Sequence, residues 1–128
     1  MKALFDTVSL KASKMVTNAY STSFSLGIRM LHESVREPVY AIYGFVRFAD
    51  EIVDSFEGYD KEALITDFRK QTVEAIEHNI SLNPILNSFQ HAVNYYKIDQ
   101  WLIDAFFDSM EMDLEEQTYD QATFEKYI

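Results

Sequence analysis

The chain has 128 residues, of which 48% are hydrophobic, and its 11 Lys and Arg against 21 Asp and Glu give a formal net charge of −10. This length suits one domain, and the hydrophobic content is sufficient for a packed core. The acidic balance argues against nucleic acid as a partner, because phosphate backbones are bound by clustered Lys and Arg, and the lack of cysteine excludes disulfides, thiolate metal sites and cysteine nucleophiles.

Apolar residues recur at three- and four-residue spacing between only 3 Gly and 2 Pro, which predicts an all-α fold. The first helix is expected from about Leu4 to Ala19, with one side formed by Leu4, Val8, Lys11, Met15 and Asn18, and it ends at the polar stretch Tyr20-Ser21-Thr22-Ser23. Ser34-Val35-Arg36-Glu37 has the pattern of a capping box and predicts a second helix that continues to about Ser55.

The remaining helices are predicted at 60–78, 84–96 and 100–117, and from Thr123 onward. Asn83 followed by Pro84 is typical of an N-cap and a first helical position, and Asp99 is a candidate N-cap for the next helix. We therefore expect a single all-α domain over residues 1–128, without an internal repeat or a linker.

Acidic residues concentrate near the end of the sequence, where residues 99–128 hold nine carboxylates and one cation, Lys126. Such charge runs usually form a solvated face, and we expect this of most of them. Asp113, within Met110-Glu111-Met112-Asp113-Leu114, is singled out as the carboxylate with a potential role in a site.

The second predicted helix carries Tyr43, Arg47, Asp50 and Asp54 on one stripe, roughly 60° wide at helical spacing. The rest of that helix is largely apolar, and only Gly44 and Glu51 are predicted on a solvent side. Two carboxylates four residues apart repel unless a cation lies between them, and hard oxygen ligands at this spacing suit Mg²⁺ with waters and substrate phosphates. The alternative is a simple ion-pair stripe between Arg47 and the two aspartates.

The segment Tyr20-Ser21-Thr22-Ser23-Phe24-Ser25 offers four Ser and Thr hydroxyls between two helices. Hydroxyls at a helix N-terminus can donate hydrogen bonds to a phosphate. An ordinary cap and turn would have the same composition, so both interpretations stay open from the residues alone.

Together these two segments resemble the squalene/phytoene synthase family. The chain has the hydroxyl-rich S-x-S-F segment, followed by A-x-Y-x-x-x-R-x-x-D-[DE]-x-x-D over Ala41–Asp54, and the M-x-M-D-L stretch ending at Leu114 is most similar to the phytoene synthase branch. The resemblance implies an isoprenoid-synthase-type helical bundle. It also implies a prenyltransferase that condenses two prenyl diphosphates head to head, with geranylgeranyl diphosphate and phytoene as expected substrate and product in carotenoid or related isoprenoid biosynthesis.

The resemblance implies Mg²⁺, for which Mn²⁺ can substitute, as the cofactor, with Asp50 and Asp54 as its ligands. Glu51 stands where many members have Asp. Mg²⁺ acting as a Lewis acid would stabilise the leaving diphosphate, so that the allylic C–O bond ionises without a protic acid.

The resemblance further implies that Arg47, Ser21 and Ser23 contact diphosphate oxygens. Tyr43 and Phe24 would lie against the reacting centre, where an aromatic face stabilises a carbocation. The catalytic set expected is therefore Tyr43, Arg47, Asp50 and Asp54.

Members of this family are roughly twice as long as this chain, which looks like an N-terminal half. A second aspartate-rich motif is not found in the sequence, so the 128-residue chain alone is expected to be inactive. The alternative function is a non-catalytic helical scaffold or interaction module derived from the family. A half-bundle would also expose an apolar face and self-associate through it.

Other features receive simpler interpretations. His32, His78 and His91 share no metal-ligand spacing, and Trp101, Phe106 and Phe107 are expected to pack against other residues rather than form a stacking platform. The longest uncharged apolar-rich run, Pro38–Val46, is too short to span a bilayer, and the first residues lack the apolar core of a signal peptide. We expect a cytoplasmic protein that makes, at most, peripheral membrane contact.

Overall fold

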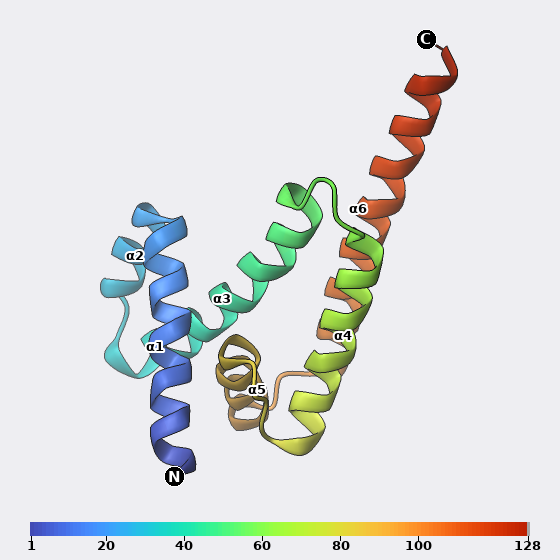
Figure 1. The fold of residues 1–128 in the computed structure, drawn as a ribbon. Helices are drawn as coiled ribbons and strands as arrows, with labels where there is room; N and C mark the ends of the chain where they lie inside the picture. Colours follow the sequence, from blue (N-terminus) through green and yellow to red (C-terminus); the bar gives the residue numbers. More distant parts are fainter. Residues whose placement is uncertain (128) are drawn as a thin grey trace.

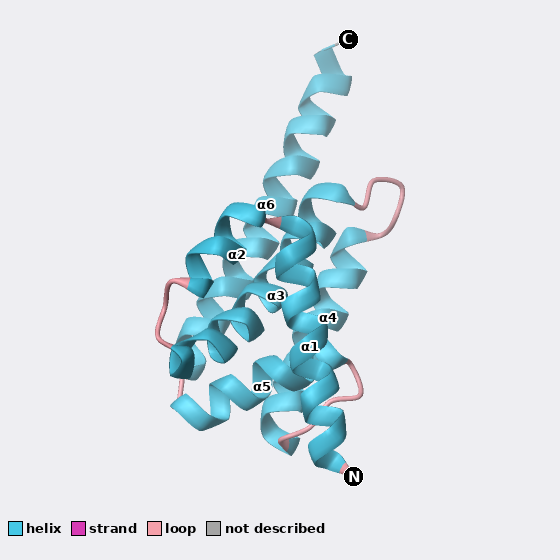
Figure 2. Ribbon diagram, turned by 90° about the vertical axis from the view of Figure 1, so that its left-hand side faces the viewer, coloured by secondary structure: helices cyan, strands magenta, loops and turns pink. Residues whose placement is uncertain are grey.

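The computed structural model describes the backbone of residues 1–127 and the side chains of residues 1–119. Within this part every element is an α-helix (Figures 1 and 2). The helices in chain order are α1 (Lys2–Tyr20), α2 (Thr22–Arg29), α3 (Glu33–Ser55), α4 (Lys61–His78), α5 (Pro84–Tyr96) and α6 (Gln100–Tyr127). The all-α prediction is confirmed. Along these helices, no stretch combines the length and the apolar character needed to cross a membrane.

Two of the predicted helix starts are confirmed by their caps. The Asp60 carboxylate accepts a hydrogen bond from the Ala63 N–H at 3.0 Å, and the Asn83 side chain accepts from the Ile85 N–H at 3.0 Å. The predicted cap at Ser34 is wrong, because α3 begins two residues earlier with His32 as N-cap. The Nδ1 atom of His32 accepts from the Ser34 N–H at 3.2 Å and so takes the place expected of a Ser hydroxyl.

Two predicted breaks differ from the structure. The polar stretch after α1 contains another helix, α2, and only Ser21 separates the two, in an extended conformation with φ −149° and ψ 100°. The predicted stop at Gln117 and restart at Thr123 are wrong, because α6 continues through both positions. That segment contains neither Gly nor Pro, so nothing in the sequence forces the helix to end there.

An aromatic cluster forms the centre of the core. The ring of Phe45 on α3 contacts four others, with centroids 3.8–5.7 Å apart, namely Phe68, Phe89, Phe106 and Phe107. These rings come from α4, α5 and α6, so one residue of α3 ties three other helices together. The prediction that Phe106 and Phe107 pack is confirmed, whereas Trp101 is 65% exposed and the prediction for it is wrong.

Helix α1 packs through small hydroxyl residues. Ser9, Ser13 and Thr17 are fully buried, and Ser9 and Thr17 satisfy their hydroxyls by donating to backbone carbonyls one turn earlier. Small side chains let α1 approach α3 closely: a Cβ added at Gly44 would lie 3.3 Å from both Cβ and Oγ of Ser13. Gly44 is therefore buried at a helix crossing, and its predicted solvent position is wrong.

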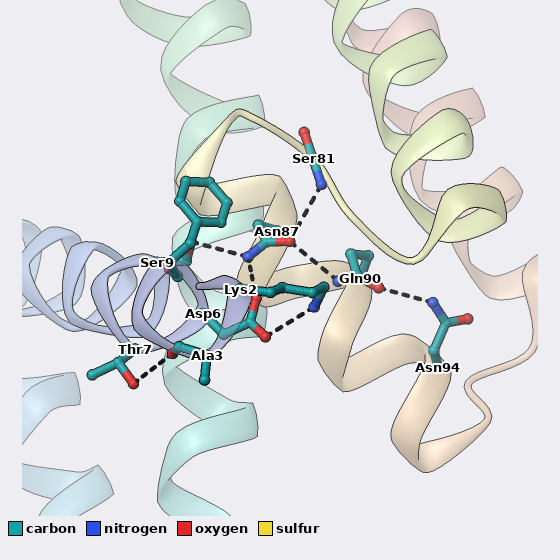
Figure 3. A network of polar contacts seen from close by, with 10 residues as sticks. Lys2, Ala3, Asp6, Thr7, Ser9, Ser81, Asn87, Gln90 and Asn94 are labelled. Carbon is teal, nitrogen blue, oxygen red and sulfur yellow. Dashed lines mark hydrogen bonds and ion pairs between the residues drawn. The ribbon is translucent and has the colours of Figure 1, made fainter.

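A buried polar network fixes α5 against α1 (Figure 3). The Asn87 amide donates to Asp6 Oδ1 at 2.9 Å and to Ser9 Oγ at 3.1 Å. Its oxygen accepts from the Ser81 N–H at 3.2 Å and from Gln90 Nε2 at 3.3 Å. The two bonds that Asn87 donates cross from α5 to α1 and need one relative placement of the two helices, so they specify the register between them.

Ion pairs join α4 to α6. Arg69 lies 3.0 Å from Asp108, 3.1 Å from Glu111 and 3.7 Å from Asp104, and its guanidinium lies 5.5 Å from the centre of the Phe107 ring. Part of the acidic run in residues 99–128 is thus paired rather than simply solvated.

Candidate functional site

The predicted site residues gather around the C-terminal half of α3, where α2 packs against it. Tyr43, Arg47 and Asp50 are half-buried on this part of α3, and Asp54 is exposed one turn later. This half of α3 also reaches the neighbourhood of α6, from which Asp113 approaches. The stripe predicted from helical spacing therefore lies between two other helices.

Phe24 of α2 stacks on Tyr43 of α3. Their ring centroids are 4.6 Å apart and the rings are inclined by 25°. The helix break at Ser21 turns the chain so that Phe24 reaches α3, and the Ser21 hydroxyl accepts from the Phe24 N–H at 3.0 Å. Two residues that the sequence placed in separate motifs therefore form one aromatic surface.

Arg47 is held by groups other than the two aspartates. Its Nη2 atom lies 2.9 Å from Glu51 Oε2, and its guanidinium carbon lies 4.8 Å from the centre of the Tyr20 ring. The alternative prediction of ion pairs from Arg47 to Asp50 and Asp54 is thus replaced by a pair to Glu51. The Nε atom of Arg47 is buried and has no hydrogen-bond partner among the described residues.

Glu51 and Tyr20 complete the surroundings of Arg47, and neither contact was predicted from the sequence, which placed Glu51 on the solvent side. Hydrogen bonding with Ser55 and then with Arg47 lowers the pKa of Glu51, so it stays ionised. Interaction with the Glu51 carboxylate in turn raises the pKa of the Tyr20 hydroxyl. The four-residue spacing from Arg47 could have identified Glu51, but the place of Tyr20 depends on how α1 and α2 pack on α3.

The pKa of Arg47 is raised although burial opposes its charged form, because the hydrogen bond and the charge of Glu51 outweigh that burial. The guanidinium is therefore permanently charged. Its unpaired Nε–H is the kind of buried donor that is costly to leave without an acceptor. An anionic oxygen of a ligand would satisfy it.

Asp50 has a raised pKa. Burial is the largest cause, the charge of Arg47 opposes it, and the charges of Asp54 and Asp113 add to it. Carboxylates from α3 and α6 therefore lie close enough to disfavour ionisation of Asp50, which is the electrostatic condition that a bound cation would relieve.

The donors at Asp50 and Asp54 fit Mg²⁺, because oxygen ligands from one or two carboxylates, completed by waters and phosphates, are its usual environment. Over the part of the chain with described side chains, three or more His, Cys, Asp or Glu do not come together as a ready-made metal cage. Coordination of Mg²⁺ by Asp50 and Asp54 would therefore have to be completed by waters and a ligand, and it stays a prediction.

Ser21 and Ser23 lie on either side of the first position of α2. Ser21 acts as the N-cap and Ser23 is exposed in the first turn. A hydroxyl that accepts one hydrogen bond still has a proton to donate, so capping and anion binding by Ser21 are compatible. Ser25, by contrast, is buried and donates to Asn18 within the α1–α2 contact.

A cavity of about 480 Å³ lies between α1, α3 and α5, away from these residues. Its lining includes Asp6, Glu37, His91 and Tyr95, and none of the predicted site residues belongs to it. His91 stacks on Tyr95 there, and His32 serves as a helix cap.

Comparisons with known proteins agree with the resemblance seen in the motifs. The family model for squalene/phytoene synthases matches residues 17–128. The presqualene diphosphate synthase of Zymomonas mobilis is 33% identical over 96% of this chain and 43% of its own length. The presqualene diphosphate synthase of Rhodopseudomonas palustris is 26% identical over 85% of this chain and 39% of its own length. The chain thus spans about two-fifths of the length of the curated relatives it matches.

Proposed function

Because the chain belongs to the squalene/phytoene synthase family, we propose that its α2–α3 site binds a prenyl diphosphate, as part of a prenyltransferase that joins two such molecules head to head. The observation that carries the proposal is the placement of Arg47 and its unpartnered Nε beside Asp50, one turn from the stacked Phe24–Tyr43 pair. Binding of a prenyl diphosphate requires carboxylates for the metal cation, a hydrogen-bond donor for the anionic diphosphate and an aromatic surface for the prenyl carbon that reacts.

The diphosphate end is assigned to the polar groups. Asp50 and Asp54 would hold Mg²⁺, which supplies a Lewis acid that neutralises charge on the leaving diphosphate. Arg47 donates from Nε to a diphosphate oxygen, while its ion pair with Glu51 fixes the direction of the guanidinium. The hydroxyl of Ser21 donates to the same anion from the start of α2.

The reacting carbon is assigned to the aromatic pair. When the allylic C–O bond breaks, its electron pair leaves with the diphosphate and a cation remains on the prenyl chain. The double bond of a second prenyl diphosphate then forms the new C–C bond, and a proton is lost. The ring faces of Phe24 and Tyr43 stabilise the cation, by about 2 kcal/mol or more where water is excluded.

The product is the finer part of the proposal. The names of both matched relatives favour presqualene diphosphate, whereas the motif ending at Leu114 favours phytoene from geranylgeranyl diphosphate. The two differ in the length of the prenyl chains, so binding of a shorter and a longer prenyl thiodiphosphate by the same protein distinguishes them.

Mg²⁺-dependent binding of a non-hydrolysable prenyl thiodiphosphate, measured by calorimetry, tests the proposal. The chain is compared with an Asp50→Ala/Asp54→Ala variant and with a Glu33→Ala/Glu37→Ala control. The control removes two exposed carboxylates at the same four-residue spacing from the other end of the same helix. Circular dichroism establishes that all three proteins are folded.

Binding that requires Mg²⁺, is abolished in the Asp50/Asp54 variant and is retained in the control would support the transferase. Binding that is equal in all three proteins, or that needs no Mg²⁺, would refute the assignment of the two aspartates. No binding by the folded chain would favour the alternative of a non-catalytic scaffold. Turnover is not expected from this chain by itself, because no second aspartate-rich motif is present in the sequence.

A further inference from the structure

Helix α1 exposes an apolar stripe on the side that faces away from the other helices. Leu4, Val8 and Met15 are 60%, 48% and 67% exposed, and Lys11 lies between them. Their spacing of three and four residues places all four on one face of the helix. The structure leaves this side of α1 uncovered because the helix packs through its hydroxyl residues instead.

The charge of the chain is divided along its length. Residues 1–36 carry five Lys and Arg against two acidic residues and have a net charge of +3, whereas residues 37–128 have a net charge of −13. Lys2 is paired with Asp6 at 2.9 Å, so Lys11, Lys14 and Arg29 supply the positive charge of α1 and α2.

Helices α3 and α5 pack directly on α1, whereas α4 and α6 lie farther from it (Figure 1). In Figure 1, α1 and α2 form one side of the molecule and α4 and α6 the other, and in Figure 2 α1 and α2 face the viewer. The neighbouring helix α2 adds exposed Leu26 and Met30 to its own Arg29. Basic charge and exposed apolar side chains therefore occur on the same side of an otherwise acidic protein.

We propose that the outer face of α1, formed by Leu4, Val8, Lys11 and Met15, docks on an anionic lipid bilayer. An amphipathic helix of this kind lies in the plane of the interface, with its apolar side chains among the headgroups and acyl chains and its lysines near anionic lipids. The acidic remainder of the chain is repelled by the same surface, which orients the molecule with α1 towards the lipid.

A second copy of the chain fits this face less well. In a symmetric dimer the same patch meets itself, which would bring Lys11 of one copy towards Lys11 of the other. Anionic lipid is complementary in charge as well as in apolar character, so it is the occupant that the stripe favours. The inference goes beyond the proposed prenyl transfer and does not depend on it.

Co-sedimentation of the chain with phosphatidylcholine vesicles, prepared with and without phosphatidylglycerol, tests the proposal. The stripe variant is Leu4→Ser/Val8→Ser/Met15→Ser. Its control changes three apolar side chains of similar exposure elsewhere, Tyr59→Ser/Leu82→Ser/Trp101→Ser. We expect binding only when phosphatidylglycerol is present, a loss of at least about ten-fold in affinity for the stripe variant, and no change for the control.

The electrostatic contribution to lipid binding is tested by comparing Lys11→Glu with Lys70→Glu. Lys70 is an exposed lysine on α4 and serves as the control position. Each lysine near an anionic surface contributes about five-fold in affinity, so Lys11→Glu should weaken binding by at least that factor while Lys70→Glu leaves it unchanged. Vesicle binding that is absent, that is equal for the two lipid compositions, or that is lost equally in the control variants would overturn the proposal. So would a dimer in sedimentation velocity that dissociates in the stripe variant.

Discussion

Asn87 is buried and makes four hydrogen bonds, so its removal should destabilise the fold. In Asn87→Ala, the Ser81 N–H and the Gln90 side-chain N–H lose their acceptor, while Ser9 still donates to Phe5 and the partly exposed Asp6 is rehydrated. Each buried donor left unsatisfied costs about 1–3 kcal/mol. Because Ser81 is only half-buried, the cost of leaving its N–H unsatisfied lies at the lower end of this range. We therefore expect the free energy of unfolding to fall by about 3 kcal/mol in total.

Urea denaturation followed by circular dichroism measures this loss as a lower midpoint at unchanged slope. Asn94→Ala is the matched control, since Asn94 donates to Gln90 at 2.9 Å but is exposed, so water can replace it. We expect the control to cost less than about 1 kcal/mol. If Asn87→Ala destabilised the chain no more than Asn94→Ala, the bonds that Asn87 accepts in Figure 3 would not have the energetic weight assigned to them.

Three further predictions concern the site and the helix contacts. The folded-state pKa of Asp50 is raised above the ordinary 3.8, so its ionised form destabilises the fold at neutral pH. In the absence of Mg²⁺, Asp50→Asn should therefore raise the urea midpoint near neutrality. This gain should vanish below pH 3.8, where Asp50 is protonated in both the folded and the unfolded chain. Arg69→Ala removes the ion pairs between α4 and α6 and should cost about 1–2 kcal/mol at low salt but less at high salt, and a salt-independent loss would mean that only packing was removed. Gly27→Ala should stabilise the chain by about 0.5–1 kcal/mol because its Cβ meets open space, whereas Gly44→Ala should not, and equal gains in thermal midpoint would contradict the close approach of α3 to α1.

Helical periodicity and capping residues predicted most of the fold. Asp60 and Asn83 act locally, through their own first turns: Asn83 was predicted as an N-cap, and Asp60 as the start of its helix. The break at Ser21 was harder to interpret because one extended residue suffices to separate two helices, and a run of Ser and Thr is equally typical of a loop. The face that α1 buries could not be predicted from hydrophobicity, since close contact with α3 selects small hydroxyl residues over larger apolar ones.

The same distinction between local and long-range contacts applies to the candidate site. The alignment of Tyr43, Arg47, Asp50 and Asp54 follows from helical geometry alone, and a resemblance to known motifs gives those residues their expected roles. Several carboxylates lie near Arg47 in the sequence, and helical spacing alone does not determine which of them pairs with it. In the structure the partner is Glu51. That pairing leaves the two aspartates without a cation of their own from α3, which is what a site for an exogenous metal ion requires.

The turn at Ser21 connects the fold to the proposed chemistry. Tyr20, the last residue of α1, lies over Arg47, and Phe24, in the first turn of α2, lies on Tyr43. Both contacts flank the same one-residue break, because Tyr20 directly precedes Ser21 and the Phe24 N–H donates to the Ser21 hydroxyl. Ser21→Ala removes the cap and should therefore loosen both contacts together, lowering stability by about 1 kcal/mol and weakening diphosphate binding beyond the loss of one hydroxyl donor. Ser21→Asp retains the cap while placing a negative charge beside the proposed diphosphate. If it bound the thiodiphosphate as tightly as the unchanged chain, Ser21 would be a cap and nothing more.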